Sequence, residues 1–408
     1  MKRGSYKSSI IKRCKVTMKK VILAALSLGL LLSGCSIGPK KEQKIVEKGN
    51  SKDKSIISKY SISDDYYKTA VPFEKGSARG LAVKGLNSRL DVDEFETGLM
   101  RIAQESYSTK DYIFQGGKYL DKDTIQALIE RKRTPEQQSN LEKVLKKRLP
   151  NGLNPELPPG EPETLEARNQ KSPMYLSQIL EQDYLKIKDE NQAELGGIVI
   201  GLAMNSVHYF TEQHGYPREQ KIDDKTLLEE GKKMAQEILP LLRKKDELKN
   251  VPITFAIYKQ ESKSSLVPGS FLSYSKVDKG SDKVEDWKAL DEKYYLFPSN
   301  DAETNYRDDA TNVKNFNAKI AEYFTGDYTA VVGRGFYKDG QLKELKLEIP
   351  VQFSGKAEVI GFTQYVTGAV MDFPNYIKVQ VTIKSVDRPE AIIIRDVKQD
   401  KPFVQVLD

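Results

Sequence analysis

The same order of sequence features occurs twice in this chain of 408 residues. Each copy begins with a tyrosine pair, Tyr66-Tyr67 and Tyr294-Tyr295, followed by apolar residues at positions i, i+4, i+7 and i+8. These offsets place side chains on one face of a helix. The residues are Phe95, Leu99, Ile102 and Ala103 in the first copy, and Phe316, Ile320, Tyr323 and Phe324 in the second. We therefore expect a helix near the start of each copy, the first with its N-cap at Asp91.

A short motif follows each predicted helix. It consists of a threonine, an aspartate and a tyrosine within four positions, with a glycine five positions after the tyrosine. The residues are Thr109, Asp111, Tyr112 and Gly117 in the first copy, and Thr325, Asp327, Tyr328 and Gly333 in the second. Because an aspartate before a strand aromatic often accepts hydrogen bonds from turn amides, we interpret the motif as structural.

The later elements also recur in order. The predicted strands of the first copy are 195–204, 253–258 and 271–272, and their counterparts in the second copy are 345–353, 377–383 and 392–394. The predicted helix at 226–242 in the first copy corresponds to 357–371 in the second. This order predicts an α+β fold of two tandem related repeats of unequal length, at 60–280 and 290–408. An insertion at about 121–173, with two helical stretches and a Pro-rich loop, lengthens the first repeat. We interpret it as a surface excursion, with a lid or a partner site as alternatives.

The N-terminal residues have the pattern of a secretory signal peptide. Lys19 and Lys20 precede an uncharged apolar run at 21–32, and small residues follow. We assign residues 1–34 to the signal peptide, with Met18 as an alternative start.

Leu32, Ser33, Gly34 and Cys35 resemble the signal peptidase box of a bacterial lipoprotein. We therefore expect lipid attachment at Cys35 and anchoring to the outer face of the cell membrane, where two acyl chains give stable binding. The partners implied are membrane lipid and the signal peptidase machinery. The alternatives are an ordinary signal peptide or a signal anchor with a chance cysteine, but the apolar run is short for a membrane span.

The charge distribution changes at Cys35. The whole chain has 65 basic and 58 acidic residues, but residues 1–34 contain eight Lys or Arg and no Asp or Glu. The chain from Cys35 onward therefore has 57 basic and 58 acidic residues, which gives no electrostatic case for nucleic-acid binding. Residues 35–59 are rich in Lys, Glu, Ser and Gly, and we expect a lipidated cysteine followed by a flexible tether.

No motif predicts catalysis, a metal or a cofactor. His208 and His214 are six positions apart, which is not the i, i+4 spacing of a helical zinc site. The sequence has no phosphate loop or dinucleotide fingerprint. Acidic residues are plentiful, so a carboxylate-dependent envelope hydrolase is the less favoured alternative. The sequence has 21 tyrosines, and a groove lined by exposed tyrosines that binds an envelope glycan or peptide is another alternative.

The chain resembles the CamS family of Gram-positive sex-pheromone lipoproteins. The residues that carry the resemblance are the box ending at Cys35, the start from Tyr66-Tyr67 to Pro72-Phe73, Arg79-Gly80-Leu81, Thr109-Lys110-Asp111-Tyr112, and Gln178-Ile179-Leu180-Glu181-Gln182-Asp183-Tyr184-Leu185. The resemblance implies a surface lipoprotein with no established enzymatic activity. It also implies that the signal peptide is processed further, to a hydrophobic pheromone peptide matching about residues 28–34.

Overall fold

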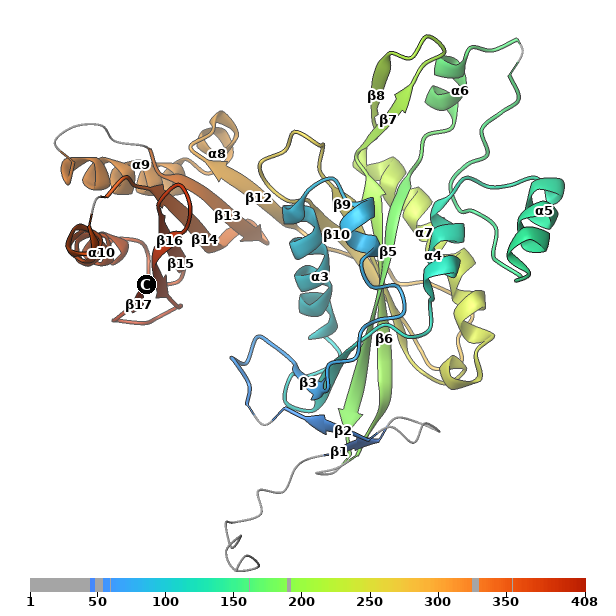
Figure 1. Cartoon of the computed structure of the whole chain (residues 1–408), viewed down its shortest axis with the longest axis horizontal. Coiled ribbons are helices and arrows are strands. Elements are labelled where there is room, and N and C mark those ends of the chain that lie inside the picture. Colours follow the sequence, from blue (N-terminus) through green and yellow to red (C-terminus); the bar gives the residue numbers. More distant parts are fainter. Residues whose placement is uncertain are drawn as a thin grey trace, which may run out of the picture. The chain divides into compact units, whose positions relative to one another are not determined.

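The computed structural model describes residues 45–47, 54–58, 60–160, 162–188, 192–324, 330–353 and 355–408. They belong to one compact unit, Lys44–Asp408. Within these residues the chain forms two large β-sheets with helices packed against them and a separate two-stranded sheet (Figure 1), which confirms the predicted α+β fold class. The signal peptide, Cys35 and the motif residues Thr325, Asp327 and Tyr328 lie outside the described residues.

The first sheet has the strand order β1-β2-β3-β4-β5-β6-β9-β10-β11. Two neighbouring pairs, β3–β4 and β6–β9, are parallel, and the other pairs are antiparallel. The strands are β1 (Ile45–Glu47), β2 (Lys54–Ile57), β3 (Lys68–Val71), β4 (Tyr112–Gly116), β5 (Leu176–Ile187), β6 (Ala193–Asn205), β9 (Ile253–Gln260), β10 (Ser270–Val277) and β11 (Lys288–Ala289).

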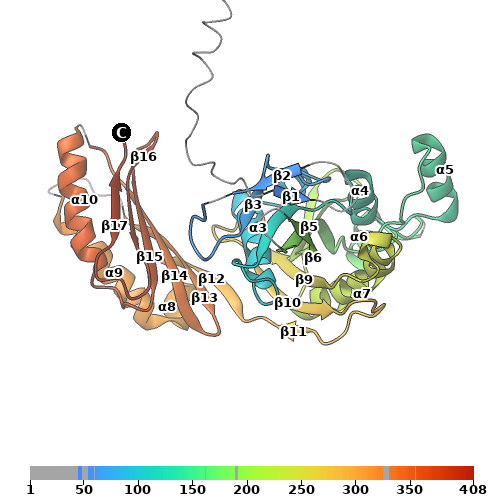
Figure 2. The same ribbon diagram turned by 90° about the horizontal axis from the view of Figure 1, so that it is seen from below.

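Helices cover both faces of this sheet, because its central strands are apolar on both sides. β6 and β9 read as almost continuous apolar runs, as expected for strands buried on two faces. Helix α3 (Arg89–Ala103) packs on one face, and the long helix α7 (Asp224–Arg243) packs on the other (Figure 2). The four residues predicted for the inner face of the first helix are buried. That helix begins earlier than predicted, because Ser88 is its N-cap and accepts from the Asp91 amide at 3.1 Å.

Part of the predicted tether is instead sheet structure. β1 and β2 lie within 35–59, where β1 pairs with β2 and β2 pairs with β3. The physical reason is an apolar contact that the low local hydrophobicity does not reveal. Ile57 is buried against Ala70, Ile113 and Leu185. Residues 45–47 and 54–57 are therefore not part of a tether.

The insertion contains three helices, although two helical stretches were predicted. They are α4 (Lys122–Ile129), α5 (Pro135–Leu145) and α6 (Leu165–Lys171). Helix α5 has no buried residue, in keeping with a surface excursion. Helix α4 differs from that expectation, because its Ile125 and Leu128 are buried in the core of the first sheet. Further elements of this part of the chain are helix α2 (Leu81–Gly85), the hairpin β7 (Val207–Thr211) and β8 (Pro217–Lys221), and the 3-10 turn η1 (Asp246–Leu248).

The second sheet has the strand order β12-β13-β14-β15-β16-β17. Its elements are β12 (Glu292–Phe297), α8 (Asn300–Asn305), α9 (Arg307–Glu322), β13 (Val332–Lys338), β14 (Gln341–Pro350), α10 (Lys356–Val370), β15 (Lys378–Lys384), β16 (Pro389–Arg395) and β17 (Phe403–Val406). Helices α9 and α10 pack on one face of this sheet, where a single apolar core forms (Figure 2). Phe316 and Ile320 on α9 contribute to that core, as the sequence pattern predicts.

The two sheets share a series of connections. In each, an antiparallel hairpin, β5–β6 or β13–β14, is followed by a crossover helix, α7 or α10. The next strand, β9 or β15, pairs parallel to the second hairpin strand, and a closing strand pairs antiparallel to it. The sheets differ beside the hairpin, since β4 follows α3 and pairs with β5, whereas β12 precedes α9 and pairs with β13.

A buried ion cluster joins α3 to the first strand of the second sheet. The Arg101 guanidinium donates to Glu94 at 2.6 Å and to Glu292 at 2.7 and 3.2 Å. The Arg101 guanidinium also lies 4.6 Å from the centre of the Phe336 ring. Tyr294 donates its hydroxyl hydrogen to Glu94. Both carboxylates are almost fully buried, so the positive charge of Arg101 compensates two negative charges that water does not reach.

Replacement of Arg101 by alanine should destabilise the protein strongly, because Glu94 would remain buried without a cation and Glu292 would keep only the more distant Lys338 amine, at 3.7 Å. We expect the free energy of unfolding to fall by about 3–5 kcal/mol, measured by urea denaturation. The control is Arg89→Ala, which removes an exposed ion pair to Asp93 and should cost no more than about 1 kcal/mol. Equal losses in the two variants would contradict a special role for the Arg101 cluster.

Candidate functional site

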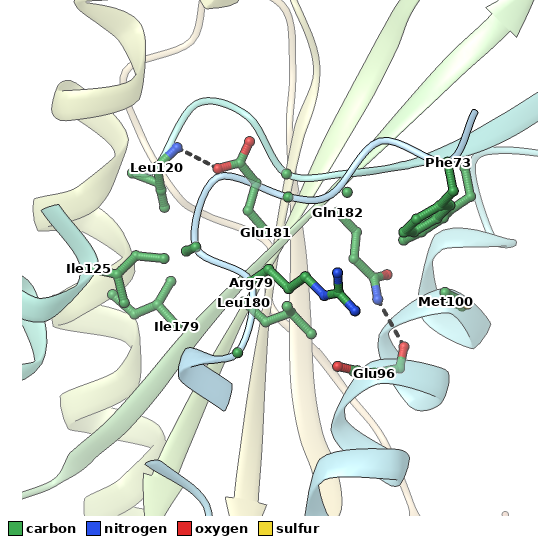
Figure 3. A pocket seen from close by; sticks show the side chains of 16 residues that line it. Phe73, Arg79, Glu96, Met100, Leu120, Ile125, Ile179, Leu180, Glu181 and Gln182 are labelled. Atoms are coloured by element: carbon green, nitrogen blue, oxygen red, sulfur yellow. Dashed lines mark hydrogen bonds between the residues drawn. The ribbon is translucent and has the colours of Figure 1, made fainter. Parts of the chain in front are cut away.

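A cavity of about 370 Å³ lies at the edge of the first sheet, between α3, β4, β5 and the loop at residues 73–80 (Figure 3). Most of its lining is apolar. The apolar side chains are Phe73, Met100, Phe114, Leu120, Ile125, Ile179 and Leu180. Concave apolar sites with a few polar groups are where small molecules usually bind, so this cavity is the candidate functional site.

The cavity exists because β4 is much shorter than β5. Strand β4 pairs with β5 only at Gln182–Lys186, and it ends at Gly116. The first half of β5 is therefore paired with β6 on one side but has no β4 neighbour on the other. The loops at 73–80 and 117–120 cross this open edge instead and form the rim of the cavity.

Glycines let these two loops approach each other closely. A Cβ atom on Gly116 would lie 2.6 Å from the amide nitrogen of Gly76. A Cβ atom on Gly117 would lie 2.6 Å from the backbone oxygen of Glu181 on β5. The loops are also joined by the Ser77 amide, which donates to the Gly117 carbonyl at 2.7 Å. Larger residues would separate the loops, because these are backbone contacts that cannot rotate away.

Glu181 holds the second loop in place. Its carboxylate accepts hydrogen bonds from the consecutive backbone amides of Lys118, Tyr119 and Leu120 at 2.9, 2.8 and 2.5 Å. Such charge-assisted bonds are stronger than those between neutral groups. The carboxylate thus fixes the loop that carries Leu120 into the cavity, and its oxygens are already occupied by protein donors.

Asp183 lies two positions further along β5, on the same side of the strand as Glu181. It is almost completely buried, and within the described residues neither carboxylate oxygen has a hydrogen-bond donor. Gln115 on β4 pairs with Asp183, and its buried side-chain oxygen also lacks a hydrogen-bond donor. Burial, and then the adjacent Glu181 carboxylate, raise the pKa of Asp183 well above its usual range.

Apart from Glu181, the polar side chains of the cavity gather at the side that faces α3. Gln182 donates to the backbone carbonyl of Glu96 at 2.9 Å, and its side-chain oxygen accepts from the Tyr184 hydroxyl at 2.7 Å. Figure 3 shows the Arg79 guanidinium and the Glu96 carboxylate on this side, away from Leu120 and Ile125. Burial raises the pKa of Glu96. Within the described residues, neither of these two charged side chains forms an ion pair or a side-chain hydrogen bond.

The repeated motif does not form this site as a unit. Thr109 lies in a turn and donates to the Asp64 carbonyl at 2.9 Å, and Asp111 is exposed in the same turn. Tyr112 packs its ring against Tyr107, with 5.2 Å between ring centroids. Only Gly117 lines the cavity.

The two motif glycines occupy different topological positions. Gly117 follows β4, whereas Gly333 lies within β13, the first hairpin strand of the second sheet. A Cβ atom on Gly333 would lie 2.7 Å from a methyl carbon of Leu347, so this glycine makes room for core packing.

The histidines lie elsewhere. His208 is buried, its ring stacks on Phe210, and burial together with the Arg131 charge lowers its pKa to about 4. His214 is exposed. Among the described residues, no group of three His, Cys, Asp or Glu side chains is placed to hold a metal ion.

The most informative site residues were not singled out as functional from the sequence. Glu181, Gln182 and Asp183 are three consecutive polar residues between the apolar pairs Ile179-Leu180 and Tyr184-Leu185 of the largely buried strand β5. That interruption is a signal that could have found them, because polar groups in a buried strand need specific partners.

The matching family model is "CamS sex pheromone cAM373 precursor", and it matches residues 73–401. The chain belongs to the CamS family. No curated protein sequence matches this member of the family.

Solved structures agree with the family match. A sex pheromone precursor from Lactobacillus salivarius subsp. salivarius is 30% identical, with a TM-score of 0.76, and the match covers 86% of this chain and 98% of that one. The C-terminal domain of the sex pheromone staph-cAM373 precursor from Staphylococcus aureus is 34% identical, with a TM-score of 0.68, covering 79% and 98%. Within the described residues of this CamS chain, no helix has the length and apolar character needed to span a membrane.

The buried Asp183 predicts a pH-dependent stability. In the unfolded chain Asp183 ionises above about pH 4, whereas the raised pKa keeps it protonated in the folded chain. Its contribution to stability is therefore complete below pH 4 and is lost as the pH rises. Asp183→Asn removes this dependence. As the pH rises above about 4, the variant should gain stability relative to the unmodified chain, by up to about 1.4 kcal/mol per pH unit.

Urea denaturation at several pH values would measure this gain. Asp111→Asn is the matched control, since Asp111 is exposed, and its stability difference should vary little with pH. A flat difference curve for Asp183→Asn would show that the carboxyl group is ionised in the folded protein.

Proposed function

We propose that this CamS protein is a lipoprotein anchored through acylated Cys35 to the outer face of the cell membrane. The observation that carries the proposal is the Leu32-Ser33-Gly34-Cys35 box directly after a basic start and a short apolar run. Its partners are then membrane lipid and the signal peptidase machinery. We propose no catalytic step for the folded part.

The carboxylates of the cavity support a non-catalytic folded part over a carboxylate-dependent hydrolase. The carboxylates in the lining of the described cavity are those of Glu96 and Glu181. Glu181 already accepts three backbone amides, so it is poorly placed to act as a base or a nucleophile. Binding of an envelope glycan or peptide remains the second candidate function, because the cavity is of the size and polarity of a ligand site.

We further propose that the signal peptide is processed to a hydrophobic pheromone peptide of about residues 28–34, Leu-Gly-Leu-Leu-Leu-Ser-Gly. The support is the family description, which names a sex pheromone precursor. The family match begins at residue 73, so the peptide itself lies outside the matched region.

Lipid attachment is tested by metabolic labelling with radioactive palmitate in a Gram-positive host. The unmodified chain should incorporate label and remain in the membrane fraction, and Cys35→Ala should lose the label completely. Cys14→Ala is the matched control, because Cys14 precedes the cleavage site and should leave labelling unchanged. Label that persists in Cys35→Ala would rule out this anchor.

The pheromone proposal has a separate test. A synthetic peptide of residues 28–34 should induce plasmid transfer in a responder strain at a concentration where a scrambled peptide of the same composition does not. Equal responses to the two peptides, or no response in a panel of responder strains, would rule out the pheromone and leave the lipid anchor untouched.

A further inference from the structure

We propose that the cavity at the edge of β5 binds an apolar amino acid or dipeptide in its zwitterionic form. The inference goes beyond anchoring and signal-peptide processing, and it depends on neither, because it rests on the folded part alone.

The cavity has two chemically different ends. Leu120, Ile125 and Ile179 supply the apolar side chains of one end (Figure 3), and the first two come from the loop and the helix that follow β4. The Glu181 carboxylate beside Leu120 already accepts three backbone amides. Burial of apolar surface there would contribute roughly 25 cal/mol for each Å² that a ligand removes from water. This end therefore suits the side chain of a branched or aromatic residue.

The other end offers one positive and one negative group. The Arg79 guanidinium is exposed, and the Glu96 carboxylate is half-buried. Neither is used in an ion pair or a side-chain hydrogen bond within the described residues. A guanidinium matches a ligand carboxylate in charge and in planar geometry, and a carboxylate matches a ligand ammonium.

The opposite charges of Arg79 and Glu96 distinguish between classes of ligand that have an apolar part. A fatty acid would satisfy Arg79, but its carboxylate would also be repelled by Glu96. An amino acid or a dipeptide brings both a carboxylate and an ammonium, so it complements both side chains. Burial raises the pKa of Glu96 although the Arg89 charge lowers it, so a further cation beside this carboxylate would relieve an unfavourable charge.

The volume limits the size of the ligand. At about 370 Å³ the cavity is near the lower end of the range for small-molecule sites, which is roughly 300–1,000 Å³. One or two residues suit this space, whereas the seven-residue peptide 28–34 is too large to enter whole. The cavity is thus assigned to small products of peptide hydrolysis and not to the pheromone peptide.

Isothermal titration calorimetry on the full chain in a mild detergent would test the assignment. Leu-Leu should bind saturably with one site per chain. Acetylation of its amine, amidation of its carboxylate, or its replacement by octanoate should each weaken binding by between about tenfold and a hundredfold, as expected when one charge-assisted hydrogen bond is lost.

Two variants test the residues themselves. Arg79→Gln should weaken Leu-Leu binding between about tenfold and a hundredfold and abolish the preference for a free carboxylate. Glu96→Gln should weaken Leu-Leu binding by the same factor and abolish the preference for a free amine. Arg148→Gln and Glu136→Gln are matched controls, because both residues are exposed and neither lines the cavity, so binding should be unchanged.

Three results would overturn the proposal. The first is no saturable binding of Leu-Leu or of a Phe-Leu probe. The second is octanoate binding as tightly as Leu-Leu, which would identify an acyl-chain site. The third is unchanged affinity in both Arg79→Gln and Glu96→Gln. None of these results bears on palmitate labelling at Cys35, so failure of this proposal is distinguishable from failure of the lipid anchor.

Discussion

Parallel pairing at the centre of each sheet is the constraint on which the rest of the fold depends. β6 pairs parallel to β9, and β14 pairs parallel to β15. Two parallel neighbours cannot be joined by a tight hairpin, so the chain must cross the face of the sheet between them. Helices α7 and α10 make these crossings, and each buries its apolar face in the core of its own sheet.

The candidate site follows from an irregularity in this plan. In the first sheet, α3 is followed by β4, a strand too short to cover the edge of β5. Glycine-rich loops cover the edge in its place, and the Glu181 carboxylate orders one of them through three backbone amides. The cavity thus lies where regular strand pairing stops, which is where side chains and backbone groups are available to a ligand.

Local periodicity was enough to predict the main elements. The apolar spacing of Phe95, Leu99 and Ile102 predicted α3, and the matching spacing of Phe316 and Ile320 predicted α9. The strands at 45–47 and 54–57 were missed, because Ile57 is buried by residues distant in the sequence. The α3 N-cap was placed at Asp91 instead of Ser88, since several residues near the start of that helix are able to cap it.

The sequence by itself determined the helices and strands with a clear apolar spacing, because such spacings span a few residues, but not strands such as β5 and β13. Only the tertiary structure decided what the polar residues inside those patterns do. Arg101 meets Glu292 across 191 positions of sequence, and Glu181 binds the amide of Tyr119 across 62. Burial and charge compensation at such distances depend on the packing of whole elements, which local spacing does not specify.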